Sequence, residues 1–147
     1  MSVVIWSGFR IAIRYKKQAA FWEQMTALCG FLQNEIRYTA DRISDVFLRF
    51  DWQKTIWNQE VTYFDFEQTI WQMVQELKLN QKEERWLCEF YRGLGTTDLE
   101  GQLAHLATYG RVFEKRFNVS QEQYEVKGKL YRSLALLCGL MIAILLI

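Results

Sequence analysis

The chain has 147 residues, half of them hydrophobic, and a formal net charge of +1. This length suits one domain with a buried core, and the near-neutral charge argues against nucleic-acid binding, which needs a strongly basic face. The sequence has no proline, the residue that interrupts helices most strongly, and it is rich in helix-forming residues, so we expect an all-α fold.

The N-terminal segment, residues 1–16, opens with the apolar run MSVVIWSGFRIAI, which Arg10 interrupts. Thirteen residues span about 20 Å as a helix, which is short for a bilayer crossing. A signal peptide is not indicated, because no basic residue precedes the run. We expect a short membrane-associated segment that lies at the interface, completes a tilted span, or is the remainder of a longer segment lost to a late start codon.

A first long helix is predicted from this region to about Thr39. Its apolar residues recur at steps of three and four, which is typical of a helix with one buried face. A shorter helix is predicted near residues 43–50, followed by a loop or partial turn over residues 50–57. The apolar residues of the first helix are Trp22, Met25, Cys29, Leu32 and Ile36.

Two further helices follow in the middle of the chain. A third helix is predicted over residues 64–77, with apolar residues along one side. Asn80 then opens a fourth helix, because Glu83 lies three residues later at the spacing of a capping box. This helix is expected to end at Gly93 and Gly95, since glycine accepts the left-handed backbone of a helix terminus.

The last helix is predicted to start at Thr97, with Glu100 again at capping-box spacing. Its apolar residues keep one seven-residue register, so we expect one long helix that continues into the membrane, with a kink at residues 118–120 as the alternative. Antiparallel pairing with the first helix would bring both apolar ends to the membrane together. The register comprises Leu99, Leu103, Leu106, Phe113, Phe117, Tyr124, Tyr131 and Leu134, with Gly110 and Ser120 in the same stripe.

The C-terminal segment, residues 130–147, is predicted to be a transmembrane helix. From Ser133 it reads SLALLCGLMIAILLI, without a charge, and its length is sufficient to cross a bilayer core. A buried core helix is the alternative, but nothing polar after Ser133 offers a solvent face. Gly139 would allow another helix to approach closely in the bilayer. The membrane-interface anchors are Lys127, Lys129, Tyr131 and Arg132.

Basic residues flank the middle domain at both membrane-facing ends. Besides those before the C-terminal segment, Arg10, Arg14, Lys16 and Lys17 follow the N-terminal run. The positive-inside rule then predicts that the helical domain, residues 17–129, lies in the cytoplasm.

No catalytic, cofactor-binding or metal-binding motif is recognisable. Cys29, Cys88 and Cys138 are widely spaced and His105 is the only histidine, so the sequence predicts buried thiols rather than a zinc site or a disulfide framework. The turn Gly93-Leu94-Gly95 lacks the lysine and the spacing of a phosphate-binding loop. We therefore predict no cofactor and no enzymatic activity.

The stretch of residues 50–71 is dense in aromatic residues. Core packing is the favoured interpretation. The alternative is contact with a partner or a membrane surface, because Trp and Tyr are enriched in both settings.

Four groups of residues resemble the pattern of one known family, in order and spacing. They are Gly8-Phe9, Ile11-Ala12 and Arg14-Tyr15-Lys16; Glu35-Ile36 and Tyr38; Leu94-Gly95, Asp98 and Gln102; and Lys129, Tyr131-Arg132, Leu134 and Gly139 with the closing ILLI. The chain resembles stage III sporulation protein AB of endospore-forming bacteria, a family similar to the F component of type II secretion systems.

This resemblance implies a non-enzymatic, membrane-anchored structural component of a secretion-like channel complex between mother cell and forespore. It places the protein in the bacterial cell membrane on the mother-cell side, and its partners would be other subunits, including a secretion-type ATPase, and further copies of itself. The motif positions Glu35, Tyr38, Asp98 and Gln102 become candidates for capping, bundle packing or partner contact. The alternatives are a tail-anchored regulator of one soluble partner, in which residues 1–13 stay outside the bilayer, and a membrane-tethered enzyme.

Overall fold

The structure is a computed structural model that describes residues 2–38, 43–57, 61–96 and 98–147. Every regular element in these ranges is a helix, which confirms the predicted all-α fold. The helices are α1 (Ser2–Tyr38), α2 (Ile43–Arg49), α3 (Lys54–Trp57), α4 (Phe66–Glu76), α5 (Gln81–Gly93) and α6 (Leu99–Leu146).

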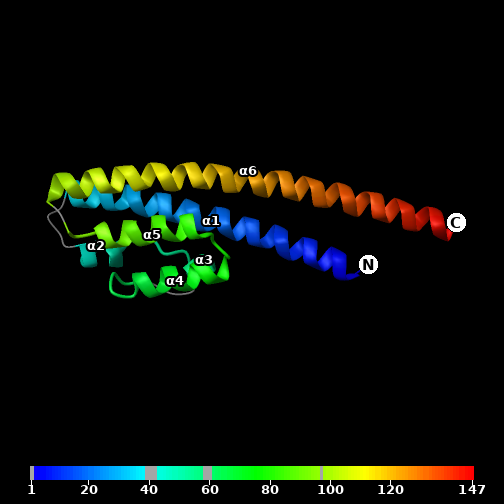
Figure 1. Cartoon of the computed structure of the whole chain (residues 1–147), viewed down its shortest axis with the longest axis horizontal. Helices are drawn as coiled ribbons and strands as arrows, with labels where there is room; N and C mark the ends of the chain where they lie inside the picture. The colour runs from blue at the N-terminus through cyan, green and yellow to red at the C-terminus, as the bar shows by residue number, and fades with distance from the viewer. Residues whose placement is uncertain (1, 39–42, 58–60, 97) are drawn as a thin grey trace.

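Helices α1 and α6 form an antiparallel pair, as predicted, and both chain ends lie at the same end of the molecule (Figure 1). Helix α6 has 48 residues and is continuous, so the predicted single helix is confirmed and the kink at residues 118–120 is wrong. At 1.5 Å per residue it is about 72 Å long. It runs on past the start of α1, and its C-terminal part has no protein neighbour (Figure 1).

The seam between α1 and α6 follows part of the predicted seven-residue register. Leu106, Phe113 and Ser120 are buried. Leu99 and Leu134 were also assigned to this stripe, but they are about half exposed, at 51% and 47%, because they lie beyond the two ends of the packed seam.

Small residues let the two long helices approach closely. A Cβ added at Gly110 of α6 would lie 3.4 Å from the Cβ of Cys29 on α1. Next along the seam, the rings of Phe113 and Trp22 pack with their centroids 5.6 Å apart. Burial raises the pKa of the Cys29 thiol far above its usual range, so this thiol stays protonated and acts as a small core residue.

The shorter helices bury aromatic side chains against this pair. Trp57 donates its indole N–H to Gln24 on α1 at 3.2 Å, and Trp52 donates to the carbonyl of Phe47 at 2.8 Å. Phe66 lies among these rings, 5.0 Å from Phe47 between centroids. The core-packing interpretation of residues 50–71 is therefore correct for most of its aromatic residues.

The start of α5 confirms the predicted cap. The Asn80 side chain accepts a hydrogen bond from the Glu83 backbone N–H at 2.8 Å and donates one to the Glu83 carboxylate at 2.9 Å. These bonds satisfy a backbone donor that the first turn of a helix leaves without an intrahelical acceptor.

The predicted start of α6 needs correction. Asp98, rather than Thr97, is the N-cap, because its carboxylate accepts from the Gly101 backbone N–H at 3.0 Å. Thr97 itself lies outside the described residues. Of the two glycines assigned to the end of α5, Gly93 is still helical, and Gly95 has the left-handed backbone with φ of 79°.

A buried ion pair joins α5 to α6. The Arg116 guanidinium lies 3.2 Å from the Glu83 carboxylate, donates to the Ser120 hydroxyl, and sits 5.8 Å above the Trp22 ring. Taking both charges out of water is unfavourable, and their attraction and hydrogen bonds offset that penalty only while both partners are present.

Replacing Arg116 with methionine should lower the free energy of unfolding by about 3 kcal/mol, because Glu83 would stay buried without its partner. The double variant Glu83→Met with Arg116→Met should lose much less, since no unpaired charge remains. Tryptophan fluorescence during guanidinium unfolding in detergent micelles measures both effects. Lys115→Met, at an exposed neighbouring position, is the matched control. Additive losses in the double variant would contradict this account.

Candidate interaction surface

The four motif residues predicted as structural or partner-contact positions lie at the end of the bundle opposite the apolar tail. Glu35 and Tyr38 belong to the last turn of α1, and Asp98 and Gln102 to the start of α6. The antiparallel pairing brings these distant parts of the sequence to the same end of the molecule (Figure 1).

Asp98 and Gln102 have structural positions there. Asp98 caps α6, and the buried Gln102 side chain donates to the carbonyl of Gly93 at 3.0 Å. This bond satisfies a carbonyl at the C-terminus of α5, where helices leave acceptors free. Gln102 thus joins the end of α5 to the first turn of α6, which Asp98 caps.

Glu35 and Tyr38 differ from each other in their surroundings. The Glu35 carboxylate lies 3.0 Å from the Arg49 guanidinium, which ties α1 to α2 at a partly exposed site. Tyr38 is 80% exposed. Of the four motif positions, Tyr38 therefore offers the most free surface for a partner.

His105 is part of the packing between α5 and α6. Its Nε2–H donates to the carbonyl of Phe90 at 2.9 Å, and its ring is parallel to that of Phe90, with the centroids 5.9 Å apart. Next to it, the Tyr109 hydroxyl donates to Glu89 at 2.7 Å. Burial, followed by this hydrogen bond, raises the pKa of Tyr109 to about 12, so it remains a neutral donor. Within the described ranges, no three metal-ligating side chains cluster.

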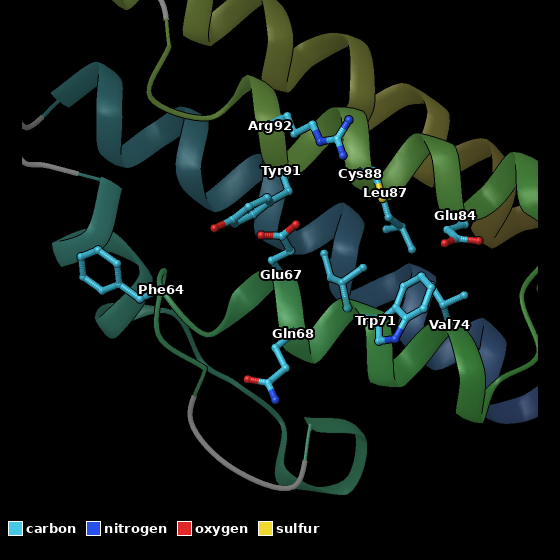
Figure 2. A pocket seen from close by; sticks show the side chains of 11 residues that line it. Phe64, Glu67, Gln68, Trp71, Val74, Glu84, Leu87, Cys88, Tyr91 and Arg92 are labelled. Carbon is cyan, nitrogen blue, oxygen red and sulfur yellow. The ribbon is translucent and has the colours of Figure 1, made fainter.

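The surface between α4 and α5 contains a groove of about 340 Å³ (Figure 2). Its floor is apolar and includes Ile70, Val74 and Leu87, which belong to the hydrophobic core. The groove is lined by Phe64, Glu67, Gln68, Ile70, Trp71, Val74, Glu84, Leu87, Cys88, Tyr91 and Arg92.

Two aromatic residues of this groove depart from the core-packing prediction. Phe64 is 81% exposed and Trp71 is 52% exposed. The sequence held a signal for Trp71: it follows Ile70 directly, and consecutive helix residues point about 100° apart, which takes Trp71 off the buried stripe. For these two residues the structure favours the alternative, a contact surface.

The pKa of the Cys88 thiol depends on the charged residues around the groove. Burial raises the pKa of its thiol, and the charges of Glu84, Glu67 and Glu89 raise it further, while Arg92 opposes them. Of these charged residues, Glu67, Glu84 and Arg92 line the groove, so its lining carries one net negative charge.

The predicted membrane-interface anchors lie on α6 just before its apolar end. This helix is long and apolar enough to cross a membrane, the single such helix in the described part of the chain. Residues 133–147 are exposed, and a Cβ added at Gly139 would meet no atom within 4 Å, so this face is open to another helix or to lipid. The anchors on the preceding turns of α6 are Lys127, Lys129, Tyr131 and Arg132.

Comparison with known families decides the identity of this bundle. A sequence model of stage III sporulation protein AB matches residues 53–147. The chain belongs to the stage III sporulation protein AB family. The matched stretch includes α3 to α6, with Asp98, Gln102 and the apolar tail, whereas Glu35 and Tyr38 precede it. No curated protein and no solved structure matches the chain.

Membership of the stage III sporulation protein AB family makes this chain a sporulation protein of stage III. The resemblance drawn from its short motifs is therefore confirmed. The exposed apolar end of α6 is a candidate membrane span by its length and composition.

Two helical glycines should respond oppositely to alanine. A Cβ at Gly93 would overlap the His105 ring, so Gly93→Ala should destabilise the protein by about 1–3 kcal/mol. At Gly30 no atom lies within 4 Å of an added Cβ. Gly30→Ala should therefore stabilise the protein by about 0.5–1 kcal/mol, because alanine loses less conformational entropy than glycine in a helix. Thermal unfolding followed by circular dichroism compares the two. If Gly93→Ala stabilised the protein instead, the His105 ring would have to move away from the new Cβ without loss of stability, which would contradict this prediction.

The acidic groove should slow alkylation of Cys88. A raised pKa leaves less thiolate at pH 8, so Glu84→Gln should lower that pKa and speed iodoacetamide labelling by about two- to fivefold. Mass spectrometry of a Cys29→Ala, Cys138→Ala background measures the rate. Glu114→Gln, exposed on α6, is the control. Equal rates in both variants would argue against an acidic groove.

Proposed function

We propose that this protein is a non-enzymatic, membrane-anchored structural component of a secretion-like channel complex between mother cell and forespore. Its family supports a role in stage III of sporulation. The observation that carries the anchoring is α6, one uninterrupted helix from the distal end of the bundle to the exposed apolar tail. Such a helix holds the bundle at a fixed distance from the bilayer.

The proposed domain division follows the same helix. Residues 130–147 would form the transmembrane helix, residues 17–129 a cytoplasmic helical domain, and residues 1–16 a membrane-associated segment. The basic residues on both long helices support a cytoplasmic bundle, and the mother-cell side is what the family resemblance implies. Those on α1 are Arg10, Arg14, Lys16 and Lys17, and those on α6 are Lys127, Lys129 and Arg132.

The proposed partners are the other subunits of the complex, including a secretion-type ATPase, and further copies of this chain. Tyr38 at the distal end is an exposed candidate for a cytoplasmic contact. Gly139 is the candidate for a contact between helices in the bilayer, because small residues allow close approach there.

One observation favours a second candidate, the tail-anchored regulator of a single soluble partner. Helix α6 continues past the start of α1, so the two apolar ends are not level (Figure 1). In that arrangement only α6 would cross the bilayer, and residues 1–13 would stay at or outside its surface.

Co-purification from sporulating cells tests the proposed function. After crosslinking, the full chain should be recovered from the membrane fraction with several membrane proteins and a secretion-type ATPase. The variant Leu137→Arg with Leu140→Arg should leave that fraction, because each charge at a bilayer centre costs about 2.5–3.5 kcal/mol. Leu48→Arg, at an exposed position of the bundle, is the matched control and should remain.

Recovery of one soluble protein alone would favour the regulator instead. A full chain found in the soluble fraction, or without partners above the background of untagged cells, would overturn the proposal.

A further inference from the structure

The outer face of α4 carries one large apolar side chain among polar ones. The exposed residues of this helix are Glu67, Gln68, Trp71, Gln72, Gln75 and Glu76. Trp71 is 52% exposed and Phe64 is 81% exposed, so a large part of each aromatic side chain is in contact with water. Tryptophan is over-represented among the residues that dominate binding at protein interfaces.

The ring of Trp71 borders a groove with a closed apolar floor. In Figure 2, Trp71 lies beside Val74 and Leu87, while Phe64 lies at a distance on the far side of Glu67. The floor residues Ile70, Val74 and Leu87 are buried, so the groove is a depression in the packed core between two antiparallel helices. A groove of this kind accepts the apolar side of a helix, whose residues recur at steps of three and four.

The charged residues that line the groove indicate the chemistry of its partner. Glu67 comes from α4 and Glu84 from α5, so a carboxylate stands on each wall, and Arg92 is the one basic residue of the lining. These carboxylates would repel phosphate groups, nucleic acid and anionic lipid headgroups. They would attract lysine or arginine side chains, and an arginine could also lie over the Trp71 ring.

We propose that the groove between α4 and α5 is a docking site for an amphipathic, positively charged helix of a protein partner. The apolar side of that helix lies on Ile70, Val74 and Leu87 and against Trp71. Its basic residues lie next to Glu67 and Glu84. This docking site goes beyond the proposed function, because its argument does not depend on which complex contains the protein.

A synthetic leucine–lysine amphipathic helical peptide is the probe. The full chain is placed in nanodiscs of zwitterionic lipid, and the anisotropy of the labelled peptide is measured against empty discs. The peptide should bind above the empty-disc level, and binding should weaken as salt rises. A leucine–glutamate peptide of the same pattern should bind at least about tenfold more weakly, because like charges oppose docking.

Charge reversal locates the site. Glu67→Lys with Glu84→Lys should weaken binding by about tenfold or more, and Trp71→Ala should weaken it similarly. The matched control, Glu114→Lys with Glu122→Lys, makes the same change in net charge at exposed positions of α6 and should leave binding unchanged. If circular dichroism shows that the lysine double variant is not folded, the double variant Glu67→Gln with Glu84→Gln removes both charges without reversing them and replaces it.

Three results would overturn the proposal. They are binding no stronger than to empty discs, equal binding of the acidic peptide, and equal loss in the groove and control variants. None of them bears on co-purification from sporulating cells, so failure here is distinguishable from failure of the proposed function.

Discussion

The contact between α1 and α6 positions the rest of the molecule. Gly110 brings the two backbones close at Cys29, and Phe113 packs on Trp22 one turn further along. Without a Cβ at Gly110 the helices need not spread to accommodate a side chain, so the ridges of one fit the grooves of the other. Because the pair is antiparallel, one end of the bundle carries the motif residues and the other carries the apolar tail (Figure 1).

The smaller helices use this pair as their support. Trp57 ties α3 to α1, His105 and Gln102 of α6 hold the end of α5, and the pair Glu83–Arg116 holds its beginning. Helix α5 is therefore attached at both ends, and α4 packs along it. The wall that α5 contributes to the groove is thus held at both ends, which favours binding because this wall loses little conformational freedom when a partner docks.

Two surfaces with different chemistry result from this arrangement. The apolar tail of α6, preceded by basic residues, suits lipid and its anionic headgroups. The α4–α5 groove, with carboxylates on its walls and a half-exposed tryptophan, suits a basic partner instead. If the apolar tail crosses the bilayer, a partner bound in the groove would be held next to the membrane, as in the proposed structural role.

The sequence alone determined the features that depend on neighbours a few residues apart. The apolar period of α1 and α6, the Asn80 cap and the uninterrupted tail were all visible, because helix periodicity and capping act within one or two turns. Tertiary structure decided the rest. Glu83 and Arg116 are 33 residues apart, and whether they meet depends on how α5 lies on α6. Phe64 and Trp71 looked like core residues by composition. Phe64 is exposed in the turn that precedes α4, and the exposure of Trp71 follows from the helical period, which places it beside the buried stripe. Spacing in the sequence could not choose the cap of α6, because Thr and Asp are both good capping residues, and the structure shows Asp98 in that role.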